Sequence, residues 1–212
     1  MNHGPSVAAF DVDHTITRHD CVSRFLIRLG GRRGIATALG RQPVRSVTAA
    51  IRRDRDDIKE IVAGGILAGR YVDDVDREGR SFAADVLAGD LRADVVARLR
   101  WHLRTGHRVV LVSASLGPYL RPFGELLGVH AVLCTDVVHE AGRYLDRLDG
   151  PNCRGEEKAV RLSAWLAGHG LSTDDLWCYG DSAGDAPMLA LSPRPVWVTG
   201  ARLPVAPEVV DP

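Results

Sequence analysis

The chain has 212 residues, of which 45% are hydrophobic, and its formal net charge at pH 7 is zero. This length allows one large domain or a core with an insert, and the composition is ordinary for a soluble globular protein. No apolar stretch is long enough to span a bilayer, and the four cysteines form neither CxxC pairs nor metal-finger spacings. These features exclude a membrane-spanning or zinc-finger protein, and without a secretory leader pattern we expect a cytoplasmic protein with reduced thiols.

The first predicted strand, residues 7–10, is followed at once by two acidic residues in the sequence VAAFDVDHTIT. Successive residues of a strand point to opposite faces, and an extended chain could not aim Asp11 and Asp13 at one atom. We therefore expect the chain to turn just after Asp11. Asp11 then lies at the carboxyl end of a buried parallel strand, where open α/β sheets bind their ligands, and Asp13 lies on the loop above it.

Residues 17–90 contain no convincing strand and carry the apolar spacing of helices instead. The segment is too long for an ordinary crossover between two strands. We interpret it as an inserted helical cap, with turns near Gly30 and Gln42. The predicted division of the chain is a core of residues 1–16 and 91–212 and a cap of residues 17–90.

Apolar runs and helical patterns alternate along the rest of the chain. This alternation predicts an α/β fold with a parallel sheet and right-handed crossovers. The segment from Asp136 to Leu148 is typical of a hairpin, which could project as a flap beside the site. The later strands are predicted at residues 109–112, 131–134, 176–179 and 196–198, and the helices at residues 94–105, 116–127, 156–167 and 183–191.

Three more motifs place polar residues at the same edge of the sheet. Ser113 follows the second strand in VVLVSAS, and its hydroxyl could donate to a phosphate oxygen. Lys158 lies near the start of a helix, where a lone lysine is usually solvated. In YGDSAGDAPML, one strand ends at Asp181 and a helix begins near Asp185, which could also serve simply as a helix cap.

Four carboxylates would meet at this edge: those of Asp11, Asp13, Asp181 and Asp185. Each close pair would repel by roughly 1 to 4 kcal/mol at effective dielectric constants of 80 to 20. A divalent cation would relieve this repulsion. Because the ligands are all oxygens, with no cluster of His or Cys, the pattern favours Mg²⁺.

Taken in order, the motifs DVDHT, VSAS, a lysine and GDSAGD resemble those of the haloacid dehalogenase superfamily of phosphohydrolases, and most closely its phosphoserine-phosphatase-like branch. The resemblance covers essentially the whole chain and implies a Rossmann-like core with a helical cap inserted after the first strand. It also implies that Asp11 is the nucleophile, which forms an aspartyl-phosphate, and that Asp13 is the general acid and base.

The resemblance implies roles for the other motif residues as well. Mg²⁺ would be held by the Asp11 carboxylate, the Asp13 backbone carbonyl and Asp181, with Asp185 as an indirect partner. Ser113 and Lys158 would hold the phosphoryl oxygens, and Ser115 is the alternative to Ser113.

Several positions depart from the pattern of that branch. His14 stands where the family commonly has a small residue, and it could bind phosphate or pack against the cap. Gly184 replaces an asparagine that phosphoserine phosphatases place near the metal. Asp20 lies nine residues after Asp11, where phosphoserine phosphatases have a glutamate that binds the substrate ammonium. Asp20 could equally be an exposed acidic residue of the first cap helix. The candidate cap residues for a substrate carboxylate are Arg24, Arg28, Arg52, Arg53 and Arg70.

The sequence therefore predicts a Mg²⁺-dependent phosphomonoester hydrolase for a small phosphorylated metabolite, with phosphoserine-like substrates first. Sugar, polyol or amino-alcohol phosphates stay open as substrates, and a phosphotransferase would use the same core. Residues 21–53 contain eight arginines and no acidic residue, which indicates either a solvated helix face or a docking surface for anionic lipid. Nucleic acid is not expected, because Phe25 is the only aromatic residue of that stretch. The oligomeric state stays open.

Overall fold

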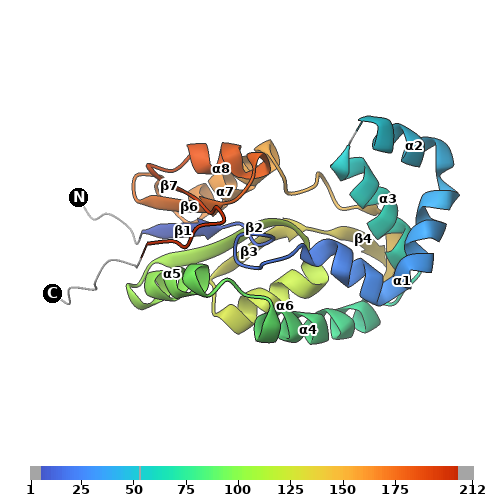
Figure 1. Cartoon of the computed structure of the whole chain (residues 1–212), viewed down its shortest axis with the longest axis horizontal. Helices are drawn as coiled ribbons and strands as arrows, with labels where there is room; N and C mark the ends of the chain where they lie inside the picture. Colours follow the sequence, from blue (N-terminus) through green and yellow to red (C-terminus); the bar gives the residue numbers. More distant parts are fainter. Residues whose placement is uncertain (1–5, 53, 205–212) are drawn as a thin grey trace.

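The computed structural model describes residues 6–52 and 54–204, and a five-stranded parallel sheet lies at its centre (Figure 1). Its strand order is β3-β2-β1-β6-β7, so that the first strand lies in the middle. All five predicted strands are present, and the predicted α/β class is confirmed. The strands are β1 (Val7–Phe10), β2 (Arg108–Leu116), β3 (Ala131–Thr135), β6 (Leu176–Gly180) and β7 (Arg194–Trp197).

Helices cover both faces of the sheet, with α5 and α6 on one side and α7 and α8 on the other (Figure 1). Alternate residues of β1 enter two separate hydrophobic clusters: Ala8 and Phe10 pack on the α5 side, Val7 and Ala9 on the α7 side. Because both faces are buried, the strands are continuous apolar runs, as expected for a parallel sheet. The helices are α5 (Ala93–Arg104), α6 (Gly117–Leu127), α7 (Glu156–Gly168) and α8 (Ala186–Ala190), with a 3-10 turn η1 (Ala183–Asp185) before α8.

The segment of residues 17–90, which lies between β1 and α5, is mainly helical, as predicted. Within the described residues it forms α1 (Cys21–Arg41), α2 (Pro43–Arg52), α3 (Arg55–Leu67) and α4 (Val72–Gly89). Both predicted turns are present, since Gly31 interrupts α1 with a φ of 62° and α1 ends at Arg41, with Gln42 as its C-cap. None of the described helices is long and apolar enough to cross a membrane.

The two chain passages that join this helical segment to the core are paired with each other. Thr17 and Leu91 form an antiparallel bridge, and the Arg92 N–H donates to Ile16 O over 2.9 Å. This pairing of residues 16–17 with residues 91–92 lies at the proposed boundary between core and cap. The return helix α4 nevertheless packs along α6 of the core, so α1, α2 and α3 form the part that projects beyond the sheet (Figure 1).

The predicted hairpin is present as β4 (Val137–Glu140) and β5 (Arg143–Leu148), and Ala141 and Gly142 both have positive φ at its turn. This conformation matches the twist of a two-residue hairpin. The hairpin packs on the cap: the Gly69 N–H donates to Tyr144 O over 2.8 Å. It therefore supports α3 and is not a free flap beside the site.

We predict that Gly79→Ala destabilises the protein. A Cβ at Gly79 of α4 would lie 2.2 Å from the backbone oxygen of Pro118 on α6, so the two helices would have to separate. The free energy of unfolding, measured by urea denaturation, should fall by about 1 to 3 kcal/mol. Gly34→Ala in α1 is the matched control, because its Cβ meets only Ile66 Cγ1 at 3.9 Å. That change should raise the free energy by about 0.5 to 1 kcal/mol, and equal values for both variants would contradict the close helix approach.

Candidate active site

Asp11 lies where β1 leaves the sheet. Its N–H still donates to Tyr179 O over 2.9 Å, and the N–H groups of residues 15, 16 and 17 then converge on Val12 O. This is the predicted tight turn, and it places Asp13 above the end of the strand. His14 occupies the turn with a φ of 63°, a left-handed conformation that glycine adopts without strain.

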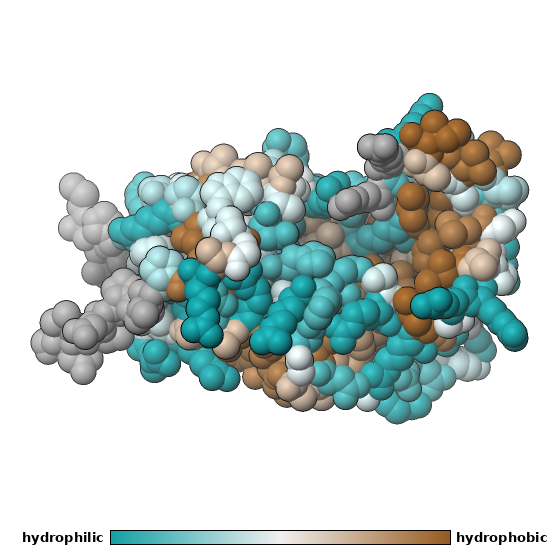
Figure 2. Space-filling model, viewed as in Figure 1, coloured by the Kyte–Doolittle hydropathy of each residue, from teal (hydrophilic) through white to brown (hydrophobic). Residues whose placement is uncertain are grey.

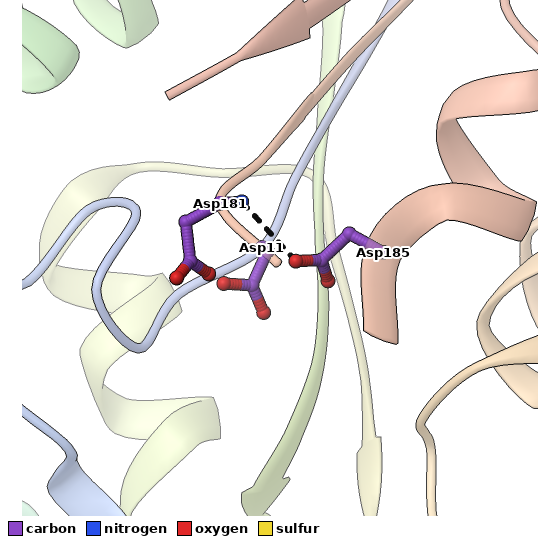
Figure 3. Close-up of side chains that lie close together, drawn as sticks. All are labelled: Asp11, Asp181 and Asp185. Carbon is purple, nitrogen blue, oxygen red and sulfur yellow. Dashed lines mark hydrogen bonds between the residues drawn. The ribbon is translucent and has the colours of Figure 1, made fainter. Parts of the chain in front are cut away.

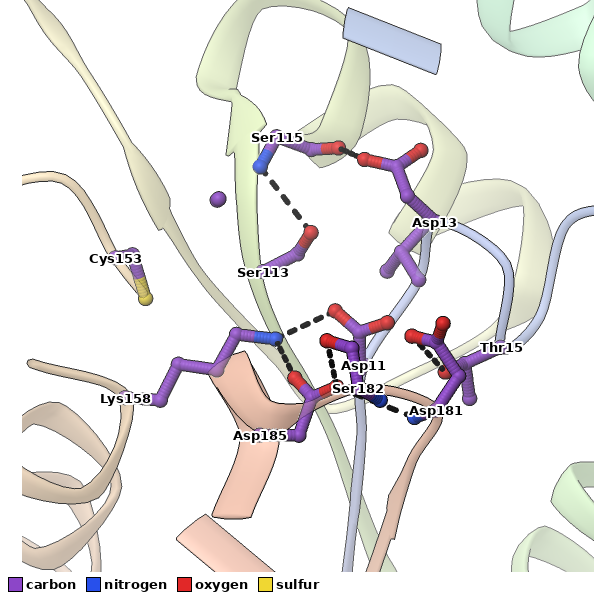
Figure 4. A network of polar contacts seen from close by, with 12 residues as sticks. Asp11, Asp13, Thr15, Ser113, Ser115, Cys153, Lys158, Asp181, Ser182 and Asp185 are labelled. Carbon is purple, nitrogen blue, oxygen red and sulfur yellow. Dashed lines mark hydrogen bonds and ion pairs between the residues drawn. The ribbon is translucent and has the colours of Figure 1, made fainter. Parts of the chain in front are cut away.

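Lys158 reaches from α7 into the end of the sheet and lies between two buried carboxylates (Figure 4). Its Nζ is 2.5 Å from Asp11 Oδ1 and 2.6 Å from Asp185 Oδ1. Burial alone would lower the pKa of Lys158, but Asp11 and Asp185 raise it above its ordinary value. Lys158 is therefore a permanent cation of the site and not a solvated surface lysine.

Asp11 keeps one oxygen available. Lys158 donates to Oδ1, and no described residue donates a hydrogen bond to Oδ2. Burial raises the pKa of Asp11, and Lys158 opposes that shift. The free oxygen can therefore bind a cation or act as a nucleophile once its negative charge is balanced.

Asp185 has two functions in the loop after β6. Its Oδ2 accepts from the Asp181 and Ser182 N–H groups over 3.1 and 3.0 Å, and its Oδ1 accepts from Lys158. Burial would raise the pKa of Asp185, but Lys158 and the Ser182 groups lower it. Asp185 thus closes a capping box on the 3-10 turn η1 with Ser182, makes no side-chain cap to α8, and contacts Lys158 of the site.

Three carboxylates lie together at the sheet edge: Asp11, Asp181 and Asp185 (Figure 3). One oxygen of each lies within 4.8 Å of the others, and Asp181 is partly exposed to the cleft. Three carboxylates and one ammonium leave a formal charge of minus two. A set of hard oxygen donors with this excess negative charge fits Mg²⁺.

The Asp13 carboxylate is not part of this cluster. It accepts from the Cys21 N–H at the start of α1 and from the Ser115 hydroxyl, each over 2.7 Å. Burial and then the Asp20 carboxylate raise the pKa of Asp13. Asp13 is thus outside the cluster of Asp11, Asp181 and Asp185, and it favours the protonated form more than an ordinary aspartate does.

The two serines of β2 have different surroundings. Ser113 lines the cleft, and its Oγ accepts from the Ser115 N–H over 3.1 Å. Ser115 is buried behind it and is absent from the described cleft wall. The Ser115 hydroxyl donates to Asp13, and Ser113 is the serine of this pair that lines the cleft.

A cleft of about 600 Å³ lies between these residues and the cap. Apolar side chains of α1 and α3, among them Leu26, Ile58 and Val62, form its cap side. Asp20 and His14 both line it, as the substrate-binding predictions require. The Asp20 carboxylate also accepts from the Val22 and Ser23 N–H groups over 3.1 Å and so caps α1.

The cap contributes a cation to the cleft wall that was not predicted from the sequence, Lys59. Lys59 of α3 donates to Ala114 O and, over 2.5 Å, to Asn152 Oδ1. Asn152 in turn donates to Asp56 over 2.6 Å. Burial lowers the pKa of Lys59 to about 8, with Asp13 opposing the shift. No sequence motif marks Lys59 or Asn152, because they meet only when α3 lies against the core.

The candidate cap arginines lie elsewhere. Arg24 pairs with Asp90, and Arg28 pairs with acidic residues of α4. Arg70 donates to Leu29 O over 2.7 Å, and Arg52 is exposed outside the cleft wall. Arg53 lies outside the described residues.

Gly184 makes room for another unpredicted cation. A Cβ at this position would lie 3.2 Å from Nε of Arg154, whose side chain also lines the cleft. The absence of a side chain at residue 184 therefore lets a guanidinium lie over the loop that carries Asp181 and Asp185.

Known proteins resemble this chain in sequence and in fold. The model of the haloacid dehalogenase-like hydrolases matches residues 8–190. The chain is 33% identical over 193 residues to Protein CicA of Caulobacter vibrioides, covering 91% of this chain and 85% of that one. It is 25% identical to a phosphoserine phosphatase of Albidiferax ferrireducens, covering 85% and 73%. A Bordetella pertussis protein of unknown function has a similar crystal structure, with a TM-score of 0.72, 28% identity and coverage of 88% and 87%.

We predict that Mg²⁺ stabilises the protein against heat and that Asp181→Asn removes most of this effect. At a Mg²⁺ concentration about a hundred times the dissociation constant, binding contributes about 2.7 kcal/mol, which corresponds to a rise in Tm of roughly 5 to 10 °C. Asp174→Asn, an exposed aspartate before β6, is the matched control and should keep the full shift. A wild-type shift in Asp181→Asn would show that the cation binds elsewhere.

Proposed function

Because the chain belongs to the haloacid dehalogenase-like hydrolase family, we propose that it hydrolyses phosphomonoesters through a phosphorylated Asp11, with Mg²⁺ as cofactor. The predicted family and the predicted enzyme class, a phosphatase, are confirmed by the comparisons. The observation that carries the mechanism is the placement of Asp11, buried at the floor of the cleft with Lys158 on one oxygen and no described donor on the other.

Asp11 supplies the nucleophile in this proposal. Oδ2 attacks phosphorus, the bond from phosphorus to the ester oxygen breaks, and an aspartyl-phosphate forms. Lys158 holds Oδ1, which orients the carboxylate and reduces its repulsion of the incoming phosphate. Water then attacks the phosphorus of the intermediate, which releases phosphate and restores Asp11.

Asp13 supplies the proton transfers. Its raised pKa favours the protonated form that gives a proton to the leaving alcohol oxygen. The resulting carboxylate then takes a proton from the attacking water. The hydrogen bonds from Cys21 and Ser115 fix the position of Asp13 for both steps.

The remaining residues bind the phosphoryl group and the cation. The Ser113 hydroxyl and the Lys158 ammonium face the region where phosphoryl oxygens would lie (Figure 4). Asp11, Asp181 and the Asp13 backbone carbonyl would hold Mg²⁺, with Asp185 fixing the loop beside it. When bound, the ion supplies positive charge to a phosphoryl group in transfer.

Phosphoserine-like metabolites remain our first candidates for the substrate, ahead of other small phosphomonoesters. Lys59 supports this choice, because it is a cap cation that reaches the cleft and could bind a substrate carboxylate. Asp20 could bind an ammonium group, although it also caps α1. We place the enzyme in the cytoplasm, where its four free, buried cysteines would stay reduced.

We predict that Asp11→Asn abolishes Mg²⁺-dependent phosphate release from every substrate in a panel of phosphomonoesters. An amide cannot replace the carboxylate nucleophile, so kcat should fall at least about 10³-fold. Asp174→Asn should keep wild-type turnover. If the wild-type protein transfers phosphate to added alcohols faster than to water, the phosphotransferase alternative holds instead.

The effect of Asp13→Asn should depend on the leaving group. Without a proton donor, kcat/KM for phosphoserine should fall by about 10² to 10⁴. The fall should be much smaller for p-nitrophenyl phosphate, whose leaving group needs no proton. Equal losses for both esters would mean that Asp13 does not protonate the leaving oxygen.

We further predict that Lys59→Met lowers kcat/KM at least about tenfold more for phosphoserine than for phosphoethanolamine. The two substrates differ only in the carboxylate that Lys59 would bind, so the comparison removes any general effect of cap placement. Similar losses for both substrates would indicate that Lys59 serves only to hold α3 against Ala114 and Asn152.

A further inference from the structure

Helix α2 carries an apolar face that the described part of the chain does not cover. Val44, Val47 and Ile51 are 79%, 58% and 77% exposed. Their spacing of three and four residues places them on one side of the helix. The space-filling view shows a hydrophobic patch at this end of the molecule, at the upper right where α2 lies (Figure 2).

The opposite side of α2 is fixed to the cap. Ala49 is buried, and Arg45 forms ion pairs with Asp57 and, over 2.5 Å, with Glu60 of α3. The Ser46 hydroxyl donates to Leu39 O of α1 over 2.9 Å. These contacts orient the helix, and they hold its aliphatic side chains outward.

The segment that carries this face has several exposed arginines, and Asp54 is the first acidic residue after it. Arg32, Arg33, Arg41 and Arg52 are all exposed. None of the four has a carboxylate partner among the ion pairs of the described residues, whereas Arg24, Arg28 and Arg45 do. Since residues 21–53 contain no acidic residue, the positive charge around α2 is not balanced by its own segment.

We propose that α2 docks on the surface of a lipid bilayer that contains anionic headgroups, with the aliphatic face in the interface and the neighbouring arginines on lipid phosphates. An amphipathic helix with an apolar face and cationic flanks binds such surfaces by burial and by charge attraction together. This docking goes beyond the proposed phosphatase reaction and does not depend on it.

The charge and the size of the apolar face of α2 argue against other binding partners. A second copy of the chain would bring two arginine-rich surfaces together, and three aliphatic side chains fall well short of the roughly 1,200 Å² that a stable interface buries. Nucleic acid would leave the aliphatic face without a partner, because single strands bind to aromatic side chains. An anionic bilayer satisfies both the apolar and the cationic parts.

The test is cosedimentation of the full chain with vesicles at low salt. We expect binding to vesicles of 70% phosphatidylcholine and 30% phosphatidylglycerol, weaker binding as salt rises, and little binding to pure phosphatidylcholine. Equal binding to both vesicles, or binding to neither, would overturn the proposal.

Two pairs of variants separate the apolar and the charged contributions. Val47→Asn with Ile51→Asn should lower the partition coefficient more than about tenfold. Val160→Asn, at a similarly exposed valine of α7, should leave it unchanged. Arg41→Gln with Arg52→Gln should lower it about 25-fold, since each arginine near an anionic surface contributes about a factor of five. Arg100→Gln with Arg104→Gln, on the exposed side of α5, is the control.

The circular dichroism spectrum and the Tm of all these variants should match those of the wild-type chain, which shows that they are folded. If the control pairs lose as much binding as the α2 pairs, general charge and not α2 is responsible, and the proposal is wrong. If the wild-type chain forms a dimer that Val47→Asn with Ile51→Asn dissociates, the face belongs to a second copy, which also overturns it.

Discussion

The contact between Lys158 and the carboxylates of Asp11 and Asp185 is the interaction on which the site depends. Each of these groups is almost fully buried, and an unpaired charge in such a place would cost several kcal/mol. The ammonium joins the end of β1, the start of α7 and the loop after β6, three segments far apart in the chain. Without the Lys158 ammonium, placing the loop that carries Asp181 beside Asp11 would cost more free energy, because the buried carboxylates would repel each other.

The positive charge of Lys158 does not neutralise the negative charge of the three aspartates. One lysine offsets only part of the charge of three aspartates, and the rest falls on the cleft side, where Asp181 is partly exposed. Asp185 binds the N–H groups of Asp181 and Ser182, and Lys158 links Asp185 to Asp11, so these contacts tie the loop to the end of β1. The excess negative charge is therefore held in a fixed place, which is the condition for selective binding of a small divalent cation.

The sequence predicted those site residues that come directly after a strand. The apolar runs before Asp11, Ser113 and Asp181 locate three strands, and parallel strands bring their carboxyl ends to one edge. The sequence was uninformative about Lys59 and Asn152, because their contact depends on how α3 lies against the core. It also could not distinguish Ser113 from Ser115, since alternate residues of a strand share a face and only the position of Asp13 separates them.

The contacts of the cap arginines also could not be predicted from the sequence. Charge can be counted along residues 21–53, but the partners of Arg24 and Arg28 come from α4 and the residue after it, more than forty positions away. Only the fold divides these arginines into those that hold α1 against α4 and those that remain exposed around α2. The candidate cation for the substrate and the candidate surface for lipid are thus different residues.

Asp13 connects the chemistry to the position of the cap. One of its oxygens accepts from the first N–H of α1, and the other accepts from Ser115 of the central sheet. A movement of α1 away from β2 cannot preserve both hydrogen bonds, and a movement that carries α3 along with α1 would also separate Lys59 from Ala114 and Asn152. The proposed acid and base therefore has its full set of partners only when the cap lies over the cleft, so enclosure of a substrate and readiness for proton transfer depend on the same contacts.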